Sequence, residues 1–262
     1  MQRFLKHKLL VVQLLRRDIE SRYRGSVLGI FWSLLTPLLM LSMYTFVFQT
    51  VFKSRWTDGA GETQLGFAII LFLGLSLHGL LTETLIKSPS LIIGHQNFVK
   101  KIVFPLQLLP CVNLLSALFS FAINLLLLLI LMFIELHRIP LTAVLFPLVL
   151  IPYLILLLGL GWFLAALGVY IRDVQQIMAT LGTLLLFLSP VFYASTVLPE
   201  AFRAFLFLNP LSLIVEASRA VLIYEQQPDW GALASYFCVS LVFAFLGYAF
   251  FKKVRPGFAD VL

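Results

Sequence analysis

The chain has 262 residues, of which 61% are apolar and 12% are charged, and its mean hydropathy is +1.00. Soluble domains carry roughly 25% charged residues and do not expose this much apolar surface to water. The composition therefore excludes a soluble globular protein. In a membrane, 262 residues allow about six spans with short connections, which leaves no length for a separate soluble catalytic domain. The net charge of +7 has two explanations, a nucleic-acid footprint or basic loops on one side of a membrane.

Six apolar runs follow one another along the chain, and each suits a helix that crosses a bilayer. A hydrocarbon core of about 30 Å needs roughly 20 helical residues, because each residue adds about 1.5 Å. Backbone groups in lipid must be bonded within their own segment, so each run is expected to be helical. The sequence predicts an all-α integral membrane fold, a single transmembrane domain over 1–262, with spans at 31–52, 65–86, 105–134, 141–169, 177–194 and 233–251.

Basic residues decide which way these spans face. Most lysines and arginines lie in the segment 1–30, in the loop 87–104 and after residue 251, and a six-span topology puts all three on one side. Loops rich in Lys and Arg stay on the cytoplasmic side of a membrane. Both termini are therefore expected in the cytoplasm, and the charge indicates topology, not a nucleic-acid partner.

Two segments on this expected cytoplasmic side resemble neither a span nor a simple turn. Segment 1–30 has apolar residues at intervals of three or four with basic residues between them, which predicts an amphipathic helix in the membrane interface. Such a helix is either a plain anchor or a lever attached to the first span. The loop 87–104 is either a solvated connection or a short helix, capped by Ser90, that docks in a partner's groove. At the start of the fifth span, Asp173 is expected as a further helix cap.

The expected external segment 195–231 contains two apolar stretches, each too short to cross a bilayer, with Asn209 and Pro210 between them. Proline cannot continue a regular helix, so two short re-entrant or surface helices are predicted. Glu216 and Arg219 are three residues apart, a spacing that allows an ion pair on the second of these helices.

Familiar catalytic signatures are missing from the sequence. It contains no GxxxxGK[ST], GxSxG, HExxH or CxxC motif, so neither a nucleotide-binding loop nor a catalytic or metal site is expected. Within the spans the candidate ionisable groups are His78 and Glu83, fewer than an ion-coupled transporter would carry. Tyr44, Phe48 and Phe52 share one face of the first span, where they either guide a sugar chain or pack against lipid and other helices.

Several segments in order resemble a known family. "RRDIESRYRGSVLGIFWSLLTPLL" at 16–39, "NFVKKIVFPLQLLP" at 97–110, "YIRDVQQI" at 170–177, "LSPVFY" at 188–193 and "LNPLS" at 208–212 are similar to the permease subunits of ABC-2 type polysaccharide exporters. Together they cover nearly the whole chain. The first segment is most similar to the permeases that export O-antigen.

The resemblance implies roles for particular residues and partners. It implies a two-fold homodimer of six-span subunits in the bacterial inner membrane, docked to two cytoplasmic ABC ATPase subunits that hold the ATP and Mg, with membrane lipids around it. No cofactor is expected on this chain. ATPase-coupling residues are then Arg16, Arg17, Asp18, Arg22, Arg24, Ser90, Asn97, Lys100 and Lys101; conduit-lining residues are Tyr44, Phe48, Phe52 and Tyr193; external gate residues are Pro199, Asn209, Pro210, Glu216 and Arg219.

The expected function is therefore transport and not enzymatic catalysis. The chain would be the permease of an ATP-driven exporter that moves a lipid-linked polysaccharide, most closely O-antigen, across the inner membrane. Two alternatives have different conduits or chemistry. One is an ABC-2 exporter of capsule, teichoic acid, or a drug or lipid. The other is an intramembrane lipid-sugar transferase, against which the missing acid–base pair counts.

Overall fold

The computed structural model describes residues 2–47, 64–100, 104–193 and 209–262. Within these ranges the chain forms helices and connecting turns, and no strand. Phe48, Phe52, Lys101 and Pro199 lie outside the described residues, and the side chain of Lys100 is not described. Predictions about those five residues therefore stay predictions.

Ten α-helices make up the described part of the chain. They are α1 (Gln2–Tyr23), α2 (Trp32–Thr45), α3 (Gln64–Lys87), α4 (Gln96–Lys100), α5 (Leu108–Leu136), α6 (Phe146–Tyr170), α7 (Val174–Leu188), α9 (Ser212–Leu222), α10 (Trp230–Val254) and α11 (Phe258–Val261). Short 3-10 turns lengthen several of them, among them Ser88–Ser90 after α3 and Leu141–Leu145 before α6. Within the described ranges, four helical stretches are long and apolar enough to cross a membrane: Leu65–Ser90, Leu108–Leu136, Leu141–Tyr170 and Trp230–Val261. They correspond to four of the six predicted spans.

The other two predicted spans are shorter helices in the described residues. α2 covers the beginning of the predicted span 31–52, and the end of that span lies outside the description. α7 ends at Leu188, so the prediction of helix up to residue 194 is wrong for residues 189–193. The cause is Pro190, because proline disfavours helical backbone in the residue before it, and Ser189 is extended with φ −94° and ψ 152°.

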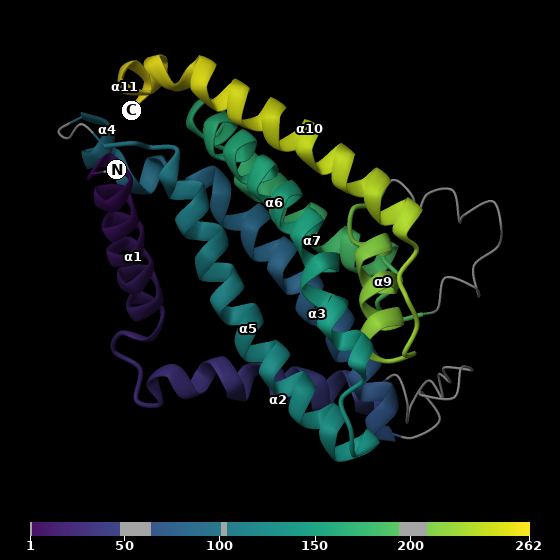
Figure 1. Ribbon diagram of the computed structural model, residues 1–262. Coiled ribbons are helices and arrows are strands. Elements are labelled where there is room, and N and C mark those ends of the chain that lie inside the picture. The colour runs from purple at the N-terminus through teal and green to yellow at the C-terminus, as the bar shows by residue number, and fades with distance from the viewer. Residues whose placement is uncertain (1, 48–63, 101–103, 194–208) are drawn as a thin grey trace.

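α5, α6 and α7 pack against α3, and α10 lies along the outer side of α6 (Figure 1). Phe67, Ile70, Leu77 and Leu81 of α3 are almost fully buried, so this helix forms the centre of the core. α6 and α10 approach so closely that a Cβ on Gly247 would lie 2.2 Å from the carbonyl oxygen of Gly159. Only glycine fits such a contact, and helices in lipid gain packing energy from small residues of this kind.

The two ends of the bundle carry different elements. Both chain termini, α4 and α11 lie at one end, which we call the termini end, and α9 lies towards the other end (Figure 1). α1 runs alongside α5 (Figure 1). After a turn at Gly25, whose φ of +83° favours glycine, α2 crosses the lower part of the bundle in this view. The amphipathic helix predicted over 1–30 is thus helical over Gln2–Tyr23 and packs on the bundle through α5.

Candidate functional site

Five segments meet in one apolar cluster at the termini end. Its buried members come from the loop after α3, the start of α5, the end of α6 and the C-terminal segment, and Leu10 and Leu14 of α1 pack against them. The buried members are Ile92, Phe104, Leu106, Leu109, Ala165, Ala166, Val169, Phe251 and Phe258. The described residues of the loop after α3 thus share one apolar core with α1, α5, α6 and α10.

A polar and aromatic junction joins α1 to this loop. Arg17 Nη2 lies 3.2 Å from His95 Nε2, and its guanidinium lies 5.9 Å from the centre of the Phe98 ring. His95 stacks on Phe98, which stacks on Phe104, with ring centres 5.4 and 4.7 Å apart. His95 Nδ1 lies 2.8 Å from the carbonyl oxygen of Leu91, so Nδ1 is the donor and Nε2 is free to accept from Arg17.

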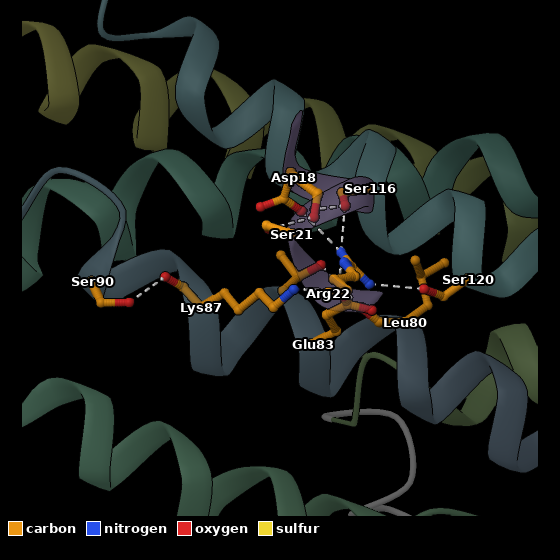
Figure 2. Close-up of polar contacts among 10 residues, drawn as sticks. Asp18, Ser21, Arg22, Leu80, Glu83, Lys87, Ser90, Ser116 and Ser120 are labelled. Carbon is orange, nitrogen blue, oxygen red and sulfur yellow. Dashed lines mark hydrogen bonds and ion pairs between the residues drawn. The ribbon is translucent and has the colours of Figure 1, made fainter. Parts of the chain in front are cut away.

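A second polar group links α1 to α3 and α5 (Figure 2). Arg22 Nη2 lies 2.5 Å from Glu83 Oε1 and 3.2 Å from Asp18 Oδ2. Arg22 also donates to Ser116 and, over 2.9 Å, to Ser120, both on α5. The side chains of Arg22 and Glu83 are each only 19% exposed. These contacts bind the C-terminal half of α1 to α3 and α5.

Each charge of this group has a partner of the opposite sign. Glu83 Oε1 also accepts from Lys87 Nζ over 2.8 Å, and Asp18 Oδ2 accepts from Ser116 over 2.5 Å. Partial burial alone would raise the pKa of Asp18, but the Ser116 hydrogen bond and the charges of Lys87 and Arg22 outweigh it and lower that pKa. Asp18 is therefore ionised at neutral pH. We call Asp18, Arg22, Glu83 and Lys87 the charge quartet, and its net charge is zero.

A cleft of about 350 Å³ opens beside the loop, between it and the α6–α7 turn. Pro89, Ser90, Ile93 and Gln96 line one side, and Gly168, Arg172 and Gln175 line the other. The two sides touch at the base, because a Cβ on Gly168 would lie only 2.1 Å from the Pro89 carbonyl oxygen. Arg172 is exposed at this cleft and gives it a positive rim.

Four of the predicted coupling residues fall into two groups. Arg17 and Ser90 face the junction and the cleft, whereas Asp18 and Arg22 belong to the charge quartet on the bundle side of α1. Arg16 pairs with Glu20 on the surface, and Arg24 and Asn97 are exposed. The family resemblance implied a single ATPase-coupling set and did not separate these two groups.

Both predicted helix caps are wrong. Ser90 does not cap a following helix, because it ends the turn Ser88–Ser90 and its hydroxyl donates to the Lys87 carbonyl over 3.0 Å. Asp173 stands before α7, but its backbone is helical and its side chain makes no cap hydrogen bond. Among the described residues, Asp229 does cap a helix: its side chain accepts from the backbone of Gly231 and Ala232 at the start of α10.

The described conduit candidates lie near one another. The ring of Tyr44 on α2 lies 5.7 Å from that of Phe192, and Phe192 lies 5.8 Å from Phe187 on α7. Tyr193 donates its hydroxyl to the Phe187 carbonyl over 3.1 Å. The structure therefore brings α2 and the end of α7 together through aromatic rings. Whether these rings contact a substrate stays a prediction.

The described gate candidates hold α9 in place. Arg219, 4% exposed, donates to the carbonyls of Pro190 and Val191, at 2.5 and 3.0 Å. Asn209 donates to Ser189 over 2.8 Å, and the carbonyl of Pro210 accepts from Tyr236 on α10. Glu216, the expected partner of Arg219, is exposed. The short helix predicted after Pro210 is confirmed as α9, and its arginine reaches inward to backbone carbonyls.

The predicted coupling residues did not include His95, Phe98, Glu83 or Ser116. Glu83 carried a signal, because a carboxylate within an apolar run calls for a partner. The aromatic spacing of residues 95, 98 and 104 was visible, but only the folded loop stacks the rings. Among the described residues, no group of three His, Cys, Asp or Glu side chains is placed to hold a metal ion.

These helices and this junction are those of an all-helical, multi-pass membrane protein. The chain belongs to the ABC-2 type transporter family, whose model matches residues 10–223. It is 30% identical over 257 residues to the O-antigen export system permease protein RfbA of Myxococcus xanthus, covering 97% of this chain and 96% of that protein. It is 25% identical over 260 residues to a protein of the same name from Klebsiella pneumoniae, covering 97% and 95%. The protein is thus a multi-pass membrane transporter subunit.

Proposed function

We propose that this chain is the permease subunit of an ATP-driven exporter that moves lipid-linked O-antigen polysaccharide across the bacterial inner membrane. The observation that carries the proposal is the similarity to O-antigen export permeases over 97% of the chain. ATP and Mg bind to a separate ABC ATPase subunit, since ABC-2 permeases work with such a partner and this sequence has no phosphate-binding loop. Two copies of the chain and two ATPase subunits form the exporter.

The termini end is the side on which the ATPase docks. Its loop 88–104 and α1 share a core, and Arg17 joins them directly through His95 and Phe98. The cleft lined by Ser90, Gln96 and Arg172 lies beside that loop and offers a positive rim to an acidic side chain of the ATPase. The termini and this loop are accordingly cytoplasmic, as the excess of basic residues predicts.

The polymer passes along a route lined by the aromatic residues of α2 and of the segment after α7. Tyr44 and Tyr193 are the described residues of this lining, joined through Phe192 and Phe187. Sugars stack on rings and bond to hydroxyl groups, so an uncharged aromatic lining holds a glycan without a tight fixed site. At the opposite end of the bundle, α9 closes this route, held by the hydrogen bonds of Arg219 and of the Pro210 carbonyl.

Reconstitution tests the proposal. Proteoliposomes that contain this chain and its ATPase should move a labelled lipid-linked polysaccharide into the lumen when ATP is added, where added glycosidase cannot reach it. Vesicles with the permease alone should move none. Uphill movement without the ATPase would refute the separate motor. ATP-dependent movement of a drug or a plain lipid, with the glycan left outside, would refute the cargo.

A further inference from the structure

The contact between α1 and α3 in the charge quartet can open without isolating a charge. Arg22 on α1 binds Glu83 on α3, but each of them also has an opposite charge four residues away on its own helix. Asp18 stands one turn before Arg22, and Lys87 stands one turn after Glu83. In both cases the acid precedes the base by four residues, which is the favourable orientation on a helix.

This arrangement changes the cost of separating the two helices. Breaking a buried ion pair is normally costly, because it leaves an uncompensated charge in a medium of low dielectric constant. Here Arg22 keeps Asp18 and Glu83 keeps Lys87 when α1 moves away from α3. The serines of α5 are likewise suited to release, since a helical serine can turn its hydroxyl back to its own backbone.

Two further observations suit this contact to release. Arg22 and Lys87 both donate to the same oxygen of Glu83, at 2.5 and 2.8 Å, so Lys87 is already bound there when Arg22 leaves. Within the described residues the buried Nε of Arg22 has no hydrogen-bond partner. A partly satisfied polar group of this kind is less stable than a fully bonded one.

The quartet also lies on the path from the loop. Arg17, which contacts His95 and Phe98, and Arg22 are five residues apart on the same helix, about 7.5 Å along its axis at 1.5 Å per residue. A rigid segment of α1 therefore joins the loop to α3 and α5. Any movement of the loop that carries α1 with it pulls directly on the Arg22–Glu83 contact.

We propose that the Arg22–Glu83 contact is a releasable latch, closed in one state of the transport cycle and open in another, with Asp18 and Lys87 taking over the two charges when it opens. The proposal rests on the proposed function only in assuming that an ATPase drives α1. In this mechanism Arg22 and Glu83 are positioning residues, and they do not touch the cargo. The latch sets how much of the ATPase motion reaches α3 and α5.

The latch makes opposite predictions for two substitutions in the same quartet. Glu83→Gln removes the carboxylate that holds Arg22, so the latch opens too easily. Lys87→Gln removes the residue that replaces Arg22, so opening now leaves Glu83 without a cation and the latch opens too rarely. A purely structural network would instead lose stability in both variants and change every readout in the same direction.

A thiol reporter measures opening without knowledge of the cargo. Cys111→Ala and Cys238→Ala remove the native thiols, and Ser120→Cys places one beside Arg22 on α5. The complex with the ATPase is labelled with a maleimide, with and without a non-hydrolysable ATP analogue. Relative to the reporter protein, labelling should be roughly fivefold faster in Glu83→Gln and slower by a similar factor in Lys87→Gln, the size expected for a partly exposed ion pair. Lys253→Gln, an exposed cation at the same end, is the matched control and should not change the rate.

Turnover measurements complete the test. Glu83→Gln should retain ATP hydrolysis and lose export, whereas Lys87→Gln should lower both together. Equal labelling rates in the two variants, or changes of the same sign, would overturn the latch. If labelling follows the prediction while no polysaccharide moves even in the wild type, the proposed cargo fails and the latch stands.

Discussion

Arg219 is a charged residue whose hydrogen bonds go to backbone carbonyls. Its guanidinium is buried and donates to the carbonyls of Pro190 and Val191, in the non-helical turn that follows α7. Arg219→Met should destabilise the protein on the order of 3 kcal/mol, because a buried acceptor left unbonded costs roughly 1–3 kcal/mol. Thermal unfolding in detergent measures the loss. Glu216→Ala on the same helix is the control, and as an exposed substitution it should change stability by at most about 0.5 kcal/mol. Equal losses in the two variants would favour the ion pair that the sequence predicted.

Arg17 differs from Arg219 because its partners are the side chains of His95 and Phe98 and not backbone carbonyls. Arg17→Glu places a carboxylate against the acceptor nitrogen of His95 and ends the contact with the Phe98 ring. We expect weaker co-purification with the ATPase and normal membrane insertion. Lys253→Glu makes the same change of net charge at the same end and should leave co-purification unchanged. Unchanged co-purification in Arg17→Glu would mean that the junction is not needed for docking.

At the scale of elements, the loop after α3 depends on one small residue of α6. Gly168→Ala would place a methyl group 2.1 Å from the Pro89 carbonyl oxygen, so the turn Ser88–Ser90 must move away from α6. The expected result is a lower unfolding temperature and a loss of ATPase stimulation. Gly79→Ala on α3 is a matched change with open space around it, and it should be neutral or stabilise by about 1 kcal/mol through helix propensity. If both variants behave like the wild type, the loop does not need this close contact.

The elements also show what the sequence could and could not predict. Apolar runs long enough to span a bilayer gave the positions of α3, α5, α6 and α10, since periodicity and length are local properties. The spacing of Asp18 and Arg22, and of Glu83 and Lys87, was equally readable. The contact between Arg22 and Glu83 was not, because it joins residues far apart in the chain and depends on how α1 packs against α3 and α5. Pro190 was visible too, but a long apolar run outweighed it, and the end of α7 was missed.

At the scale of the whole molecule, charge distribution and geometry agree. The segments that the basic residues assign to one side, namely the N-terminus, the loop after α3 and the C-terminus, lie at one end of the bundle (Figure 1). α9 lies towards the other end, where Glu225, just beyond it, pairs with Arg138 over 2.7 Å. The positive-inside rule describes how a chain is oriented when it is inserted into the membrane. The fold is set by packing between helices, so the two are independent. Because the two agree, the remaining question is which side of the membrane the termini end faces.

Thiol labelling from either side of the membrane provides that test. Both native cysteines are replaced by alanine, and a single cysteine is introduced at Gln226, after α9, or at Lys252, near the end of α10; both positions are exposed. In intact spheroplasts a membrane-impermeant maleimide should label Gln226→Cys and leave Lys252→Cys unlabelled, and inside-out vesicles should reverse the pattern. The reversed pattern in spheroplasts would place the termini end outside, where no ATP-bound partner could reach the loop and α1. Labelling of both positions from one side would instead contradict the bundle itself, because a spanning α10 must separate them.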